Sequence, residues 1–298
     1  MHAQAGDSLL QLWRGSGARS LVVVGTGKNV GKTVTTRAIY RAALDRGLVC
    51  GLTSVGRDGE TADIVDASGK PRLWLAPQTV VATARDVLPR SPASEILALS
   101  PYMTAAGALV YARVRAGANY ELIGPPNASA LRAVVDALLA FAPYVLVDGA
   151  IDRIAALAGA RDAIVVACGA AAARTLDEAI VDVRALVVRL RTPRFDGAGE
   201  SLAIEGALSA AMTARLIAAR EKRAIVVRDP TQIALTGKAA LHAFEHLTIR
   251  CERPLQVIAA TVASIGRERT FDPRAFAHAV AEATGLPTFD VYAAERAA

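Results

Sequence analysis

The chain has 298 residues, of which 53% are apolar and 21% are charged. This composition excludes a disordered or collagen-like chain, which would lack apolar residues or carry far more glycine and proline. The net charge is +6, but only five of the 34 basic residues are lysines, and the arginines are spread along the chain. Because a nucleic-acid interface needs clustered charge as well as excess charge, we expect no nucleic-acid partner.

The sequence lacks the patterns of a membrane protein and of a secreted protein. No apolar run approaches the roughly 20 residues that a membrane-spanning helix needs, and the N-terminus lacks the pattern of a signal peptide. The three cysteines lie far apart, which indicates neither a disulfide framework nor a metal site. We therefore expect a cytoplasmic protein that does not bind membranes.

In chain order, strands and helices are predicted to alternate, which is typical of a doubly wound, mostly parallel sheet in a three-layer α/β fold. The predicted strands are 20–25, 48–54, 144–148, 163–167, 224–227, 256–262 and 288–291. The predicted helices are 32–46, 131–141, 174–190, 207–221 and 273–284. We interpret residues 1–298 as one domain. Its least regular part is an inserted region at 60–125, with short strands at 72–75, 109–114 and 120–123 and a helix near 80–87.

The strongest motif is a glycine-rich stretch between a buried strand and a helix. The residues that we predict to bind a nucleotide are Gly25, Thr26, Gly27, Lys28, Asn29, Val30, Gly31, Lys32, Thr33 and Val34. Glycines let successive N–H groups point at phosphate oxygens, and the start of the helix adds its positive end. Lys32 supplies a catalytic cation for the β- and γ-phosphates, and the Thr33 hydroxyl supplies a ligand for Mg²⁺. The motif predicts ATP and Mg²⁺ as cofactors.

The spacing of this motif also leaves an alternative open. The strict phosphate-loop pattern has glycine at position 26, where this chain has threonine. Gly25 and Gly27 begin a dinucleotide-binding fingerprint, but Val30 stands where that fingerprint has its third glycine. A purely structural turn is the remaining interpretation.

Two aspartates that follow predicted strands are candidate metal ligands. Asp148 ends the apolar strand 144–148, where it can hold Mg²⁺ beside the Thr33 hydroxyl, unless it only caps a turn. Asp58 follows the strand 48–54, and ligands of open α/β sheets bind at the carboxyl ends of strands. We predict that Asp58 binds Mg²⁺ directly or through water, or orients the attacking water. A solvent-exposed loop residue is the alternative.

Other segments carry weaker signals. The stretches 168–170 and 228–231 each follow a predicted strand, and either could hold the base of a nucleotide. Asp152 and Arg153 could reach the γ-phosphate or form a surface ion pair. His242 and His246 have the spacing of metal ligands on a helix, but no third ligand is evident, which favours a surface role.

The loop and the segment Asp148-Gly-Ala resemble those of dethiobiotin synthetase and the related cobyrinic acid amide synthetases, a branch of the P-loop proteins that also contains the Mind-type ATPases. The resemblance implies ATP-dependent activation of a small carboxylate or amine, and it implies a homodimer. Two features depart from it. Thr53-Ser-Val-Gly-Arg57 lacks the lysine that dethiobiotin synthetases carry at this strand end, and Gly27 replaces the additional loop lysine of Mind-type ATPases.

A second resemblance rests on the loop together with the segments 55–60, 120–125 and 147–153. The combination resembles a subunit of the reactivating factor for the cobalamin-dependent lysine 5,6-aminomutase. This resemblance implies a slow ATPase that acts on a partner protein and exchanges its damaged cofactor. Since the strand-end lysine is missing, we prefer this hypothesis to a dethiobiotin synthetase-like ligase.

Overall fold

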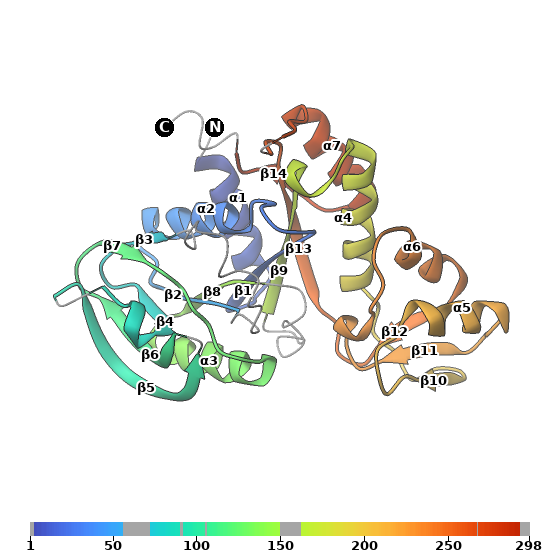
Figure 1. The fold of residues 1–298 in the computed structure, drawn as a ribbon, viewed down its shortest axis with the longest axis horizontal. Coiled ribbons are helices and arrows are strands. Elements are labelled where there is room, and N and C mark those ends of the chain that lie inside the picture. The colour runs from blue at the N-terminus through green and yellow to red at the C-terminus, as the bar shows by residue number, and fades with distance from the viewer. Residues whose placement is uncertain are drawn as a thin grey trace. The chain divides into compact units, whose positions relative to one another are not determined.

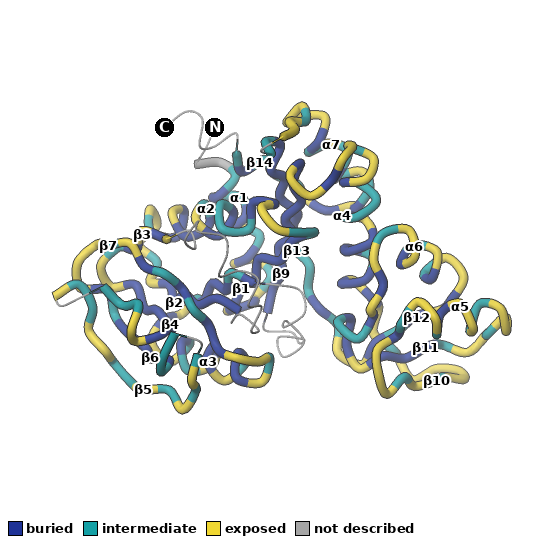
Figure 2. Tube along the Cα trace, in the orientation of Figure 1, coloured by how far each residue is buried: buried dark blue, intermediate teal, exposed yellow. Residues whose placement is uncertain are grey.

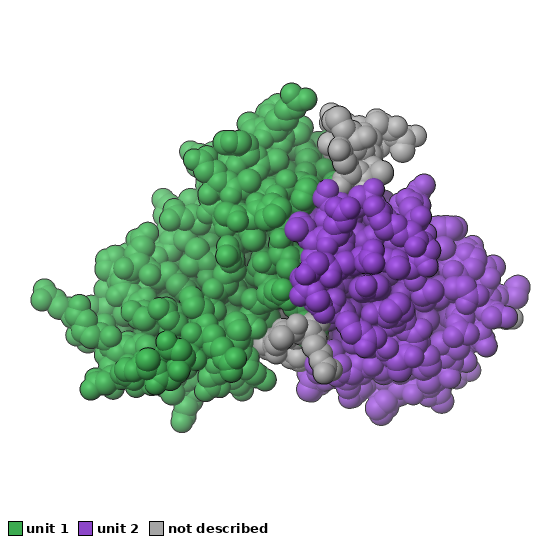
Figure 3. Space-filling view, turned by 180° about the vertical axis from the view of Figure 1, so that it is seen from behind, with its two compact units in different colours: residues 1–5, 24–32, 157–298 green, residues 6–23, 33–156 purple. Residues whose placement is uncertain are grey.

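The computed structural model describes residues 3–55, 72–89, 92–104, 106–149, 162–266 and 268–292. Within them the chain is an α/β protein with a large, mostly parallel sheet, as predicted, and this sheet has nine strands. This composition of elements is compatible with a three-layer fold. The chain divides into two compact units (Figure 3): unit 1 contains residues 1–5, 24–32 and 157–298, and unit 2 contains residues 6–23 and 33–156.

The strands of unit 2 form one row in the large sheet (Figure 1). In order they are β1 (Ser20–Gly25), β8 (Tyr144–Asp148), β2 (Cys50–Ser54), β4 (Val80–Ala84), β6 (Gly107–Val114) and β5 (Ser94–Thr104). The first four run parallel, whereas β6 is antiparallel to β4, and β5 is antiparallel to β6. Strands β3 (Leu73–Leu75) and β7 (Ala118–Tyr120) form a separate antiparallel pair.

The prediction of a helix near 80–87 is wrong. Val80–Ala84 form strand β4, and only Arg85–Val87 continue as a short 3₁₀ helix. All five residues of β4 are buried, between β2 on one side and β6 on the other. Two valines and a threonine stiffen this run in favour of a pleated, enclosed strand, so tertiary burial outweighs its local helical pattern.

The helices of unit 2 cover its strands. Helix α3 (Ala128–Phe141) begins at Asn127, whose side chain accepts a hydrogen bond from the Ala130 N–H, and it packs on β2, β4 and β8. Helix α1 (Ala3–Gly15) approaches α2 (Lys32–Asp45) closely, because a Cβ at Gly6 would lie 2.5 Å from the Ala38 carbonyl oxygen. The close approach explains why position 6 is glycine.

Unit 1 contributes three parallel strands in the order β14 (Thr288–Asp290), β13 (Gln256–Ala263) and β9 (Asp162–Gly169). Strand β9 is buried along its whole length (Figure 2), as expected for a central parallel strand. Helix α4 (Leu176–Leu190) packs on β9 and β13, and α7 (Pro273–Thr284) packs on β13 and β14.

A second, smaller parallel sheet also belongs to unit 1 (Figure 1). Its strands are β10 (Ser201–Ala203), β11 (Ala224–Val227) and β12 (Ile249–Cys251), and α5 (Ala210–Ala218) and α6 (Gly237–His246) connect them. Leu208, Ile225, Val227 and Ile249 belong to its own buried cluster. In the described part of the chain, no helix is both long and apolar enough to span a membrane.

Candidate functional site

The glycine-rich stretch forms the turn between β1 and α2, as its sequence predicts. Strand β1 is buried throughout, and α2 begins at Lys32. Asn29 and Gly31 adopt left-handed backbone conformations, with φ of 59° and 91°. Glycine takes such values without strain, and asparagine is among the few other residues that tolerate them. The loop therefore has the tight left-handed turns for which its sequence is suited, and the helix N-terminus follows directly.

Close packing explains the unusual position of the first glycine. A Cβ at Gly25 would lie 2.5 Å from Cγ2 of Val30 and 3.2 Å from the Ala167 carbonyl oxygen. A Cβ at Gly27 would lie 2.9 Å from the Cβ of Ala172. Thr26 is half-buried, and its N–H donates to the Ala167 carbonyl at 3.0 Å. Glycine is thus required at positions 25 and 27, and the loop accommodates a side chain at 26.

The loop rests on residues that the sequence analysis did not assign to it. A Cβ at Gly169, where β9 ends, would lie only 2.6 Å from Cα of Val30, which is itself buried. On the other side, a Cβ at Gly31 would lie 3.0 Å from the Cβ of Ala263, the last residue of β13. A glycine directly after an apolar strand was the available signal for Gly169. Of the two stretches predicted as candidates for the base, 168–170 therefore adjoins the loop.

Lys32 folds back over its own loop. Its Nζ donates a hydrogen bond of 2.6 Å to the carbonyl oxygen of Gly27. The side chain is half-buried, whereas Lys28 and Asn29 are exposed. The ammonium group is therefore held at the loop and has only to exchange a carbonyl oxygen for an anionic one in order to bind a phosphate. Val34, the last residue of the predicted set, is half-buried in the first turn of α2.

Thr33 and Asp148 meet within unit 2. The Thr33 Oγ1 donates to Oδ2 of Asp148 at 3.0 Å. The backbone of Asp148 is fixed by its strand neighbours, because its carbonyl oxygen accepts from the Val55 N–H and the next N–H, of Gly149, donates to Val23. The half-buried carboxylate of Asp148 therefore faces the first turn of α2.

The two side chains fit a magnesium ion. Hydroxyl and carboxylate oxygens are ligands that Mg²⁺ prefers, at about 2.0–2.1 Å in octahedral geometry. Two adjacent ligands of such an ion lie about 2.9 Å apart, close to the 3.0 Å between Thr33 Oγ1 and Asp148 Oδ2. A cation could therefore replace the hydrogen bond with little movement of either side chain. Asp58, Asp152 and Arg153 lie outside the described residues.

The second candidate for the base, Arg228–Thr231, follows β11 of the small sheet. Asp229 is fully buried and lies within 3.5 Å of the Arg228 guanidinium and 3.3 Å of the Arg253 guanidinium. Its Oδ1 also accepts from the Thr231 N–H, which caps a 3₁₀ turn at Pro230–Gln232. These contacts give Asp229 a structural role at the end of the strand.

The three cysteines are buried and free. Burial raises the pKa of the Cys168 thiol to about 12, although a hydrogen bond with Thr26 opposes this increase. Burial likewise raises the pKa of Cys50 to about 12 and that of Cys251 to about 11. Burial thus favours the protonated form of all three thiols, as expected of structural cysteines.

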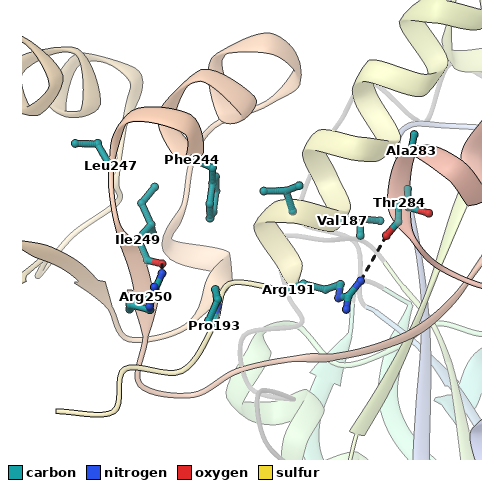
Figure 4. Close-up of a pocket in the computed structure, with 10 residues that line it drawn as sticks. Val187, Arg191, Pro193, Phe244, Leu247, Ile249, Arg250, Ala283 and Thr284 are labelled. Atoms are coloured by element: carbon teal, nitrogen blue, oxygen red, sulfur yellow. Dashed lines mark hydrogen bonds between the residues drawn. The ribbon is translucent and has the colours of Figure 1, made fainter. Parts of the chain in front are cut away.

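A pocket of about 440 Å³ lies elsewhere in unit 1 (Figure 4). Its lining comes from α4, α6, β12 and the end of α7, and it includes Val187, Phe244 and Ile249 beside Arg191 and Arg250. Arg191 donates to the Thr284 carbonyl oxygen at 3.4 Å. Among the predicted nucleotide and metal ligands that the structure describes, none lines this pocket, so it is a feature separate from the loop.

Neither protein-family models, nor curated proteins, nor solved structures match this chain.

Proposed function

We propose that this chain is a P-loop protein that binds ATP together with Mg²⁺ and hydrolyses it slowly. The observation that carries the proposal is the contact between Thr33 and Asp148 at the start of the helix that follows the glycine-rich loop. A threonine directly after a loop lysine, facing a strand-end aspartate, is the arrangement that holds the metal ion in P-loop nucleotide hydrolases. A dinucleotide site has no use for this contact.

The packing of Val30 also disfavours the dinucleotide alternative. In a dinucleotide fingerprint, the third glycine allows close packing of helix against strand. Here the corresponding residue is a valine that is buried against Gly169. Val30 thus packs against the loop, and a Cβ at Gly25 would clash with its side chain.

In the proposed reaction, water attacks the γ-phosphorus, and the products are ADP and inorganic phosphate. The loop N–H groups and the N-terminal end of α2 hold the phosphates, and Lys32 moves from the Gly27 carbonyl onto the β- and γ-oxygens. Thr33 and Asp148 would hold Mg²⁺, and the ion would supply positive charge that offsets the charge of the phosphates. Asp58, outside the described residues, is the proposed group that orients the attacking water or completes the metal site.

The partner is proposed from the sequence resemblance together with a feature at the end of β2. That strand ends at Ser54, whose hydroxyl donates to the Leu122 carbonyl at 2.8 Å, and no lysine stands there for an amine or carbamate substrate. We therefore propose a protein partner, of the kind represented by a cobalamin-dependent aminomutase, or a second copy of the chain. The alternative is a dethiobiotin synthetase-like ligase that acts on a small carboxylate or amine.

Calorimetric titration with ATP and GTP, with and without Mg²⁺, tests nucleotide binding. We expect one triphosphate to bind per chain and to bind more tightly with Mg²⁺. Hydrolysis assays then separate the two kinds of partner: stimulation by a partner protein supports the proposal, and turnover that requires a small acid or amine supports the ligase. Failure of both nucleotides to bind would remove the P-loop function.

Asp148→Asn tests the metal site. The substitution keeps the size of the side chain and its ability to accept from Thr33, but it removes the negative charge that holds Mg²⁺. We expect the affinity for ATP in Mg²⁺ to fall at least about tenfold, while the affinity without Mg²⁺ stays unchanged. Asp136→Asn, at an exposed ion pair with Arg132 on α3, is the matched control. Equal losses with and without Mg²⁺ would leave Asp148 with a structural role alone.

A further inference from the structure

The last turn of helix α6 carries three side chains that can bind a metal ion. The helix buries Ala240 and Ala243, and Phe244 faces the pocket of Figure 4. His242, Glu245 and His246 remain exposed on the outer side. The spacing of the two histidines alone does not indicate a third ligand, and the structure provides one in Glu245.

The ligating atoms are close enough to share one ion. One nitrogen from each imidazole and one carboxylate oxygen all lie within 4.8 Å of one another. The centroids of the two imidazole rings are 4.1 Å apart. Ligands of a tetrahedral zinc ion at about 2.0–2.1 Å lie about 3.4 Å apart, so the exposed side chains would have to rotate and bring these atoms closer together.

A hydrogen bond to the backbone already orients one of the ligands. Nδ1 of His246 lies 2.9 Å from the carbonyl oxygen of His242. Since a carbonyl oxygen can only accept, Nδ1 must carry the hydrogen, which leaves the lone pair of a neutral imidazole on Nε2. Metal-binding histidines are commonly fixed in this way through their second nitrogen, often by a backbone carbonyl.

The position on the helix favours a cation. His246 is the last residue of α6, where the helix dipole is negative and carbonyl groups lack partners within the helix. The carboxylate of Glu245 adds a negative charge beside the two imidazoles. Two nitrogen ligands and one oxygen ligand suit zinc, whereas Mg²⁺ prefers oxygen ligands alone.

We propose that His242, Glu245 and His246 bind one Zn²⁺ ion on the outer face of α6. Three ligands from the protein leave the fourth position of a tetrahedral ion open to water or to a group from another molecule. The site lies on α6, beside the small sheet of unit 1, and it shares no residue with the loop that we propose for ATP. The proposal of a zinc site can therefore be tested independently of the proposed nucleotide function.

Calorimetric titration of the full chain with ZnCl₂, in buffer that contains millimolar Mg²⁺, tests the proposal. We expect one Zn²⁺ per chain, with an affinity that falls at least tenfold in His242→Gln and in Glu245→Gln. Both residues are exposed, so circular dichroism and the thermal midpoint should match those of the original protein. With Co²⁺ as a probe, the visible absorption of a four-coordinate ion should appear and be lost in the same two variants.

The chain offers a matched control, because it contains only four histidines. The double variant His2→Gln/His278→Gln removes the other two and should bind Zn²⁺ like the original protein. Absence of stoichiometric binding would overturn the proposal. So would an affinity that survives in His242→Gln or is lost in the control, because the ion would then bind elsewhere.

Discussion

Replacing Lys32 by alanine is expected to lower the affinity for ATP in Mg²⁺ at least tenfold and the rate of hydrolysis about a hundredfold or more. The ammonium group is held 2.6 Å from the Gly27 carbonyl, inside the loop where the phosphates are proposed to bind. Its removal takes away a mobile cation that can follow charge onto the departing γ-phosphoryl group. Calorimetric titration and a phosphate-release assay measure the two losses separately.

Two control variants test whether the loss depends on a lysine at position 32 or only on the net charge of the protein. Lys222→Ala removes an exposed lysine elsewhere on the surface and should leave both quantities unchanged. Lys32→Arg keeps the charge but replaces a compact ammonium by a planar, larger group, so it should restore little activity. Unaltered binding and hydrolysis in Lys32→Ala would contradict the proposed site.

The buried parallel strands could be predicted because their signal is local. The runs at 20–25 and 144–148 are apolar on both faces and end in glycine or aspartate, and the structure places β1 and β8 there. The same criterion failed at Val80–Ala84, where a run of five residues between polar neighbours fits a helix or a strand. Burial between β2 and β6 favours the strand, and this burial depends on residues far away in the chain.

Strand β5 was not predicted at all, for a physical reason. It lies at the edge of the sheet, pairs with β6 and carries two register shifts, and its burial alternates only from Ala98 onward. Pro101 interrupts its pattern, which an edge strand tolerates because one side of its backbone needs no partner in the sheet. Large exposed side chains such as Leu99 and Met103 also lack the polar alternation that indicates a strand.

The candidate site likewise has one part that the sequence predicts and one part that it does not. The turn conformation and the proximity of Thr33 to Asp148 could be predicted, since the carboxyl ends of adjacent parallel strands lie at one edge of a sheet. The support of the loop by Gly169 and Ala263 could not. It depends on where β9 and β13 end relative to Val30 and Gly31, and no local pattern encodes that register.

Gly25→Ala should destabilise the protein through this support. The new methyl group would lie 2.5 Å from Cγ2 of Val30, and Val30 cannot retreat because its Cα already lies against Gly169. Overpacking of this kind costs about 1–3 kcal/mol, so we expect the free energy of unfolding in urea to fall by that amount. Displacement of the loop should also weaken ATP binding, which calorimetry measures on the folded variant.

Two further variants locate the strain. Gly15→Ala adds the same methyl group at the end of α1, where a Cβ would meet nothing within 4 Å, and it should be neutral or slightly stabilising. Val30→Ala removes the atom that the new methyl group meets. The double variant Gly25→Ala/Val30→Ala should therefore lose less stability than the two single losses added together. Strict additivity, or a Gly25→Ala variant as stable as the original protein, would show that the loop adjusts without cost and that position 25 does not require glycine.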